Sequence, residues 1–255
     1  MQDGLPVLLF LDFDGTLAPI RRHPSLVSLP VSNRRFLKRF SQIPGVHLAV
    51  VSGRVLSDLK KRTAVRGICY VGNHGLQMEG TGIRYLHPAV RRGKGILSKI
   101  AREIRMAVKG LPGVWLEDKQ FSLSLHLRQA SAAGKKKAQK LFLARVRPFV
   151  AAGRVRVTRG KEVLELRLPI DWNKGSAVKW LLQKWVPARS GRPLVIAAGD
   201  DRTDEDMFRA VSPGGISILV GEPNGSTRAR YRVNNPSGLY RFLKKLQGQL
   251  LHSSR

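Results

Sequence analysis

The chain has 255 residues, 42% of them hydrophobic, a single cysteine (Cys69) and a formal net charge of +29 at pH 7. These features exclude a membrane-spanning protein, because no apolar stretch reaches the roughly 18 residues that a bilayer requires, and a single cysteine excludes internal disulfides. Since the N-terminus has no signal-peptide pattern, we expect a cytoplasmic globular protein without a membrane partner, and the positive charge keeps polyanion binding open as an alternative.

The first part of the chain alternates short apolar strands with helices. Val7–Leu11 is a continuous apolar run, which is typical of a strand buried on both faces of a parallel sheet. A helix is expected over residues 32–43, beginning at Ser32 or Asn33. The alternation continues with a strand in "VHLAVVSGR" (Val46–Arg54), a helix in "VLSDLKKRT", a strand in "GICYVGNHG" (Gly67–Gly75) and a hairpin around Gly80–Gly82.

The middle of the chain has a different pattern. Val90–Gly110 has helical periodicity, and "FSLSLHLR" alternates strictly, as does a strand that buries only one face. Between Ala89 and Leu168 there are 20 basic and 5 acidic residues. With "GVWLED", "KKKAQKLFLARVRPFV", "RVRVTRG" and "KEVLELRL", these segments predict an inserted α+β domain with the order α-β-β-α-β-β.

Strands and helices alternate again after this insert. "RPLVIAAGDD" (Arg192–Asp201) and "GISILVG" predict strands, whereas "RTDEDMFRAV" and "PSGLYRFLKKLQGQL" predict helices. The whole pattern predicts an α/β protein whose core is a doubly wound parallel sheet. The expected organisation is a first core part over residues 1–87, the inserted domain over 88–168 and a second core part over 169–255.

Polar residues follow four of the predicted core strands: Asp12, Ser52, Asn73 and Asp200. In doubly wound sheets, ligands bind beyond the carboxyl ends of the strands, so these residues are expected to meet at one edge. Asp12 and Asp14 lie within the apolar segment "VLLFLDFDGTLAPI", where an unpaired buried charge is costly. These two carboxylates therefore require a partner.

The segment "DFDGT" resembles the first motif of the haloacid dehalogenase superfamily of phosphotransferases, Asp-x-Asp-Gly-Thr. The other motifs are matched by Ser52 in "VVSGR", Lys174 in "DWNKGSA" and the acidic segment "GDDRTDEDMF". The resemblance implies a haloacid-dehalogenase-like (Rossmannoid) core. It also implies a Mg²⁺ ion as the partner of the carboxylates, bound by Asp12, Asp200 and the main-chain carbonyl of Asp14.

The same resemblance implies roles for these side chains. Asp12 attacks phosphorus and forms an aspartyl-phosphate, and Asp14 protonates the leaving oxygen and then deprotonates water. The transferring phosphoryl group is bound by Ser52 and Lys174. Asp201 and Asp204 hold the metal site and Lys174 in place, although either carboxylate could instead be an acid that favours the N-terminal end of a helix dipole.

The likeness narrows to the trehalose-6-phosphate phosphatase family over essentially the whole chain. "GNHG" (Gly72–Gly75), "LEDKQFSLSLHLR" (Leu116–Arg128) and "GKEVLELR" (Gly160–Arg167) resemble motifs of that family. The resemblance implies hydrolysis of trehalose 6-phosphate to trehalose and inorganic phosphate, a step of trehalose biosynthesis. The implied substrate-binding residues are Gly53, Arg54, Asn73, His74, Glu117, Lys119, His126, Arg128, Lys161 and Glu165.

Alternatives remain open at this point. A related magnesium-dependent phosphatase, acting on sucrose phosphate or a glycosyl phosphoglycerate, would share the core and a similar insert. A polyanion-binding protein on an inactive phosphatase fold would suit the charge, but no nucleic-acid-binding module is recognisable. We therefore expect a monomer that binds a sugar phosphate and not nucleic acid. For His126, the alternative is a place on the second face of an alternating strand.

Overall fold

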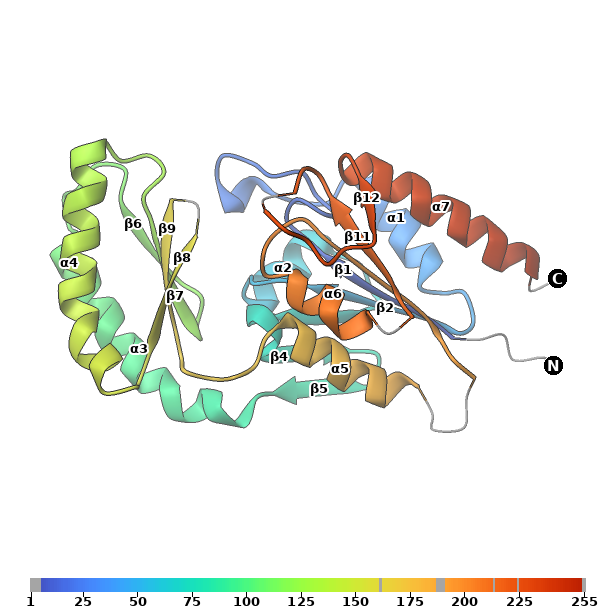
Figure 1. The fold of residues 1–255 in the computed structure, drawn as a ribbon, viewed down its shortest axis with the longest axis horizontal. Helices are drawn as coiled ribbons and strands as arrows, with labels where there is room; N and C mark the ends of the chain where they lie inside the picture. Colours follow the sequence, from blue (N-terminus) through green and yellow to red (C-terminus); the bar gives the residue numbers. More distant parts are fainter. Residues whose placement is uncertain (1–5, 161, 187–190, 213, 224, 254–255) are drawn as a thin grey trace. The chain divides into compact units, whose positions relative to one another are not determined.

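The computed structural model describes residues 6–160, 162–186, 191–212, 214–223 and 225–253, apart from the side chains of residues 92 and 94 (Figure 1). Its internal contacts divide the chain into two compact units. The core unit comprises Met1–Tyr85 and Trp172–Arg255, and the insert unit comprises Leu86–Asp171. The sequence-based boundaries at residues 88 and 168 lie two and three residues inside the insert unit.

Within the described residues, the core sheet has eight strands in the order β12-β11-β10-β1-β2-β3-β4-β5. Neighbours from β12 to β3 are parallel, and β4 pairs antiparallel with β3. This topology confirms the predicted α/β core. The strands are β1 (Val7–Asp12), β2 (Val46–Val51), β3 (Cys69–Gly72), β4 (Gln77–Gly80), β5 (Ile83–Leu86), β10 (Leu194–Gly199), β11 (Ile216–Val220) and β12 (Tyr231–Val233).

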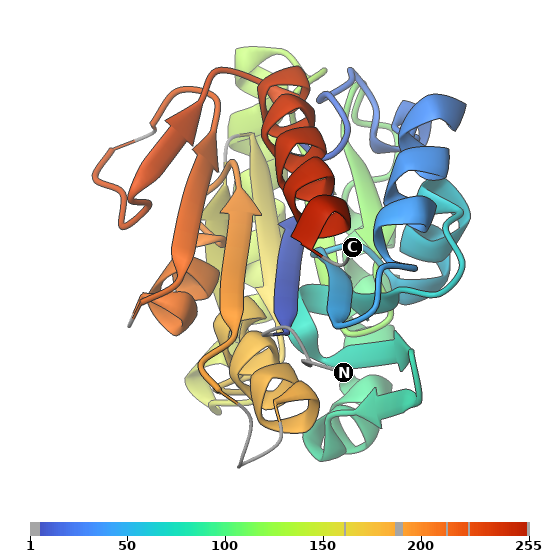
Figure 2. The same ribbon diagram turned by 90° about the vertical axis from the view of Figure 1, so that its right-hand side faces the viewer.

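Helices cover both faces of this sheet. In β1, Leu9 packs in one hydrophobic cluster with residues of α1, α2 and α7, and Phe10 packs in a second cluster with residues of α5 and α6. Figure 2 shows α7 lying across the first of these faces. The chain is therefore doubly wound, as predicted. The core helices are α1 (Val31–Phe40), α2 (Leu56–Thr63), α5 (Lys174–Trp185), α6 (Glu205–Val211) and α7 (Pro236–Ser253).

Several elements differ from the sequence-based expectation. Helix α1 begins at Val31 directly after Pro30, and not at Ser32 or Asn33; proline supplies a fixed φ and no N–H, which suits the start of a helix. Helix α6 begins only at Glu205, because residues 201–204 form a turn. Helix α5 and the short edge strand β12 were not among the elements expected from the sequence.

The chain leaves and re-enters the core unit at adjacent positions. The rings of Tyr85 and Trp172 stack with their centroids 5.6 Å apart and their planes at 24°. Nε1 of Trp172 donates a hydrogen bond to the carbonyl of Gly75 at 2.8 Å. These contacts join the two halves of the core unit at the point where the insert begins and ends.

The insert unit contains an antiparallel sheet in the order β6-β7-β9-β8 and two long helices. One face of β7 packs against the helices through Leu123 and Leu125, and its other face carries Ser122, Ser124 and His126. This arrangement confirms the predicted order α-β-β-α-β-β. Among the described residues, no helix has the length and apolar character needed to cross a bilayer. The elements are α3 (Pro88–Ala107), β6 (Trp115–Asp118), β7 (Ser122–His126), α4 (Ala132–Ala151), β8 (Arg156–Gly160) and β9 (Val163–Arg167).

Candidate active site

Four residues that the sequence analysis singled out lie at one edge of the core sheet. Asp12 is the last residue of β1, while Ser52, Asn73 and Asp200 directly follow β2, β3 and β10. These strands are parallel, so their carboxyl ends point to the same edge. The side chains of Asp12, Ser52 and Asn73 are buried, and Asp200 is partly exposed.

Lys174 is held between two buried carboxylates. Its Nζ donates hydrogen bonds to Oδ1 of Asp12 and to Oδ1 of Asp204, both at 2.7 Å. Burial alone would lower the pKa of Lys174, but the charges of Asp12 and Asp204 raise it well above its usual value. Lys174 therefore remains a cation. It is the first residue of α5, whose start is fixed by Asn173, because Oδ1 of Asn173 accepts the backbone N–H of Ser176 at 2.9 Å.

Asp12, Asp200 and Asp204 form an oxygen-rich cluster in which one carboxylate oxygen from each residue lies within 4.8 Å of the others. Burial, and next the charge of Asp204, raise the pKa of Asp200 to about 7. Burial also raises the pKa of Asp204 to about 6 and that of Asp12 well above its usual value. The single positive charge of Lys174 thus does not compensate the negative charge of the three carboxylates. A cation that prefers hard oxygen donors would compensate it, so the residues present fit a metal ion.

Gly15 makes room for the carboxylate of Asp200. Its φ is +84°, and a Cβ at this position would lie 2.0 Å from Oδ2 of Asp200. The neighbouring Thr16 contacts the same carboxylate, with Oγ1 3.4 Å from Oδ1. Glycine in the "DFDGT" segment is therefore required by both the backbone conformation and the close approach of Asp200.

Asp204 organises the loop that carries Asp200. Its Oδ2 accepts the backbone N–H groups of Asp200 at 3.0 Å and of Asp201 at 3.1 Å, while its Oδ1 accepts from Lys174. It precedes α6 but makes no side-chain capping bond to that helix. Asp201 is exposed, and its Oδ1 accepts the backbone N–H of Thr203 at 2.8 Å. Both aspartates thus stabilise the turn that carries Asp200.

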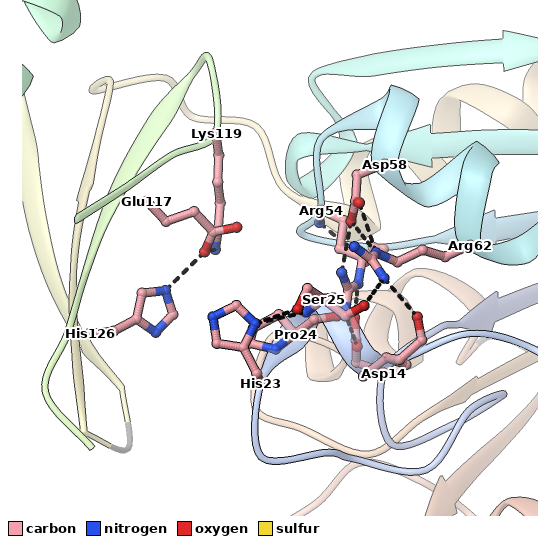
Figure 3. A network of polar contacts seen from close by, with 12 residues as sticks. Asp14, His23, Pro24, Ser25, Arg54, Asp58, Arg62, Glu117, Lys119 and His126 are labelled. Carbon is pink, nitrogen blue, oxygen red and sulfur yellow. Dashed lines mark hydrogen bonds and ion pairs between the residues drawn. The ribbon is translucent and has the colours of Figure 1, made fainter. Parts of the chain in front are cut away.

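The carboxylate of Asp14 is bound by Arg54 through two hydrogen bonds. Nε of Arg54 donates to Oδ2 at 2.7 Å, and Nη2 donates to Oδ1 at 2.6 Å. Figure 3 shows the guanidinium of Arg54 between Asp14 and Asp58, and Nη1 donates to Oδ2 of Asp58 at 2.7 Å. Asp58 was not predicted as a partner of Arg54, because Arg54 lies before helix α2 and outside its i, i+4 pattern.

The loops that follow β2 and β3 fit closely together. Oγ of Ser52 accepts the backbone N–H of Arg54 at 3.1 Å. The ring of His74 lies against Gly53, where a Cβ would be 2.5 Å from the ring. Asn73 has a φ of 52°, and within the described residues neither atom of its buried side-chain amide has a hydrogen-bond partner. Because an unpaired buried amide is costly, this amide is suited to bind a polar ligand.

A second group of predicted residues lies on the polar face of the insert sheet. Nε2 of His126 and Oε2 of Glu117 are hydrogen-bonded at 2.9 Å (Figure 3), and the ring of His126 stacks on Trp115 with centroids 3.9 Å apart. Nζ of Lys119 lies 3.6 Å from Oε1 of Glu165 and 3.9 Å from Oε2 of Glu117. This arrangement alternates hydrogen-bond donors and acceptors, which sugar hydroxyls require.

Two further residues were predicted for the substrate site of the insert. Arg128 is exposed, and Lys161 lies outside the described residues. Arg167 was not predicted, yet its Nε donates to Oε2 of Glu165 at 2.8 Å, and Oγ of Ser122 donates to Oε1 at 3.3 Å. The i, i+2 spacing of Glu165 and Arg167 on one strand was the signal, because it places both side chains on the same face.

Known proteins resemble this chain over nearly its whole length. The sequence pattern of the trehalose-phosphatase family matches residues 10–237. A trehalose-phosphate phosphatase of Mycobacterium marinum is 34% identical over 257 residues, covering 97% of this chain but 64% of that protein. The chain thus spans less than two thirds of this relative.

Solved structures are also similar to this chain. The crystal structure of a trehalose-6-phosphate phosphatase related protein has a TM-score of 0.81 and 26% identity, covering 96% of this chain and 99% of the other. A haloacid dehalogenase-like hydrolase from B. subtilis, at 16% identity, covers 93% of this chain and 98% of the other with a TM-score of 0.58, and shows the fold alone.

Proposed function

Because the chain belongs to the trehalose-phosphatase family, we propose that it is a phosphoric monoester hydrolase that converts trehalose 6-phosphate to trehalose and inorganic phosphate. The observation that supports this activity best is the convergence of Asp12, Lys174, Asp200 and Asp204 at one edge of the core sheet. A carboxylate held by a buried cation and flanked by further oxygen ligands is an arrangement that suits covalent phosphoryl transfer.

The proposed first step uses Asp12 as the nucleophile. Lys174 holds Oδ1 of Asp12, so Oδ2 attacks phosphorus in line as the bond between phosphorus and the sugar oxygen breaks. Asp14 gives a proton to that leaving oxygen. In the second step Asp14 takes a proton from water as the water oxygen attacks phosphorus and the bond to Asp12 breaks. Such acid–base help contributes about 10²–10⁴-fold in rate.

We infer that the metal ion is Mg²⁺, held by carboxylate oxygens of Asp12 and Asp200 and the main-chain carbonyl of Asp14. Bound there, it would offset the repulsion between the phosphate and the carboxylates. Lys174 and Ser52 add positive charge and a hydrogen bond for the phosphoryl oxygens. Asp204 keeps Lys174 and the Asp200 loop in place through the three hydrogen bonds described above.

We infer that the polar face of the insert sheet binds the sugar. Glu117 and Glu165 supply acceptors for hydroxyl groups, and Lys119 supplies a donor between them. In the core unit, the buried amide of Asn73, which has no hydrogen-bond partner among the described residues, and the ring of His74 are further candidates for contacts to the substrate. A site that pairs hydroxyls with such groups discriminates strongly against analogues that lack them. That the protein is cytoplasmic and monomeric stays a prediction.

Phosphate release from a panel of sugar phosphates tests this proposal. We expect trehalose 6-phosphate to be preferred over sucrose 6-phosphate and glucosyl phosphoglycerate, and turnover to stop with a chelator and return with Mg²⁺. Asp12→Asn should abolish turnover while the protein stays folded, because asparagine can still accept the hydrogen bond from Lys174. A preference for sucrose 6-phosphate would contradict the substrate, and full turnover by Asp12→Asn would contradict the nucleophile.

A further inference from the structure

We propose that Arg54 is a positioning residue, which holds the carboxylate of Asp14 in place for both proton transfers and does not bind the substrate. This inference rests on the proposed function and assigns Arg54 differently from the sequence-based expectation. The observation behind it is the pair of hydrogen bonds from Nε and Nη2 of Arg54 to the two oxygens of Asp14, at 2.7 and 2.6 Å (Figure 3).

Each of the three guanidinium nitrogens of Arg54 donates a hydrogen bond within the core unit. Besides the two bonds to Asp14, Nη1 donates to Oδ2 of Asp58 at 2.7 Å, and Nη2 donates to the carbonyl of Pro24 at 2.9 Å. The guanidinium also lies over the ring of Phe13, 5.5 Å from its centroid. Its side chain is 10% exposed. A phosphate ligand would have to break bonds to a carboxylate in order to use these donors, which argues against a direct contact with the substrate.

The surroundings of Arg54 fix it in this position. Nε of Arg62 donates a bifurcated hydrogen bond to both oxygens of Asp58, at 2.7 Å to Oδ1 and 2.8 Å to Oδ2. Arg62 in turn donates from Nη1 to the carbonyl of Val27 at 3.0 Å. Arg54 is therefore braced from the side opposite Asp14 by helix α2 and by the segment around residues 24–27.

Such bracing matters because a proton transfer is sensitive to position. A free aspartate side chain rotates about two bonds, and the loss of a fixed geometry between reacting groups is costly in rate. When Asp14 carries the proton, its hydrogen bonds to Arg54 weaken, because the carboxyl group is no longer an anion. The bonds from Arg54 to Asp58 and Pro24 then keep the guanidinium in place to bind the carboxylate again after the proton has left. Arg54 itself exchanges no proton.

The experiment compares two leaving groups by rapid mixing of the Mg²⁺-loaded enzyme. The sugar oxygen of trehalose 6-phosphate leaves only with a proton, whereas p-nitrophenolate leaves without one. For Arg54→Gln we expect the first step with trehalose 6-phosphate to slow by roughly 10–100-fold, a part of the full acid–base effect. With p-nitrophenyl phosphate, the rate of the p-nitrophenolate burst should change less than about threefold. The steady-state turnover of this substrate should still fall, because the attack of water needs Asp14.

Arg54→Lys separates orientation from charge. Lysine keeps the positive charge but cannot bind both oxygens of Asp14 at once, so we expect it to resemble Arg54→Gln. Rescue by lysine, or a raised KM with an unchanged kcat, would show that Arg54 binds the substrate phosphate and would overturn the proposal. In an Asp14→Asn background, Arg54→Gln should cause no further loss, because the group that it positions is already absent.

Arg62→Gln is the matched control. Arg62 is in the same network and contacts Asp58, but it does not contact Asp14. We expect this variant to lose only a small part of what Arg54→Gln loses, because Arg54 keeps its own bonds to Asp14, Asp58 and Pro24. An equal loss in both arginine variants would mean general loosening and overturn the proposal. If the wild-type protein prefers another sugar ester, only the proposed substrate fails, and the same comparison is made on that ester. If the Mg²⁺-loaded wild-type protein releases phosphate from none of these esters, both proposals fail.

Discussion

Replacing Lys174 by methionine should destabilise the protein strongly. Lys174 is 3% exposed and bridges Asp12 and Asp204 at 2.7 Å each, and methionine fills a similar volume without the charge. Breaking a buried ion pair by removing one partner costs about 3–5 kcal/mol. In a domain whose total stability is about 5–15 kcal/mol, this is a large part. The corresponding fall in melting temperature is roughly 6–20 °C.

The assay is denaturant unfolding of the chelated protein at pH 7.5 and at pH 5. The loss of unfolding free energy should be smaller at pH 5. Burial already raises the pKa of Asp204 to about 6, and removal of the lysine will raise it further, so protonation at pH 5 removes the negative charge of Asp204. Adding Asp204→Asn to the methionine variant should recover part of the stability, since asparagine removes the second charge but keeps an acceptor. An unfolding free energy within about 1 kcal/mol of wild type at pH 7.5 would refute the reasoning.

Other variants of the two residue groups have specific expected outcomes. In the chelated protein, the pKa values of Asp200 and Asp204 are raised, so the folded state holds more protons than the unfolded state between about pH 4 and 7. The melting temperature should therefore fall as the pH rises through that window. Asp200→Asn should flatten this slope, and an unchanged slope would contradict the shared cluster. Gly15→Ala should lower the free energy of unfolding by about 1–2 kcal/mol and weaken Mg²⁺ binding in calorimetry. Gly82→Ala is the control: its φ is also positive, but nothing lies within 4 Å of its Cβ, so Mg²⁺ binding should be unchanged. Glu165→Gln should raise KM for the sugar phosphate about tenfold or more. An equal rise of KM for p-nitrophenyl phosphate, which has no sugar, would argue against a sugar contact.

The fold and the edge where the site lies could be predicted from the sequence because both follow from repetition along the chain. Asp12 and Asp200 are far apart in sequence, yet each ends an apolar run, and the ends of parallel strands share one edge. The strictly alternating "FSLSLHLR" likewise separated an apolar face from a polar face, as the structure shows. The expectation that this strand buries only one face is wrong, because Ser122 and Ser124 on the polar face are also buried between neighbouring strands. Short-range periodicity was sufficient for these parts.

Side-chain partners could not be predicted in the same way. Arg54 follows a strand and lies near the predicted phosphate site, so the sequence favoured a substrate contact, whereas its actual partners Asp14 and Asp58 depend on rotamers and on the path of residues 24–27. Strand β12 was missed because three largely exposed residues carry no apolar pattern. The +29 charge also has no structural explanation.

The stacked pair Tyr85 and Trp172 has a consequence for how such chains diversify. Since the backbone leaves and re-enters the core unit at neighbouring points, the core unit needs only a short connection there, whatever segment stands in place of the insert unit. Recombination could therefore exchange one intervening segment for another, or vary its length, without disturbing the strands that carry the aspartates. The polar face that the insert carries would then change with the replaced segment, while the cluster of Asp12, Lys174, Asp200 and Asp204 in the core unit stays the same.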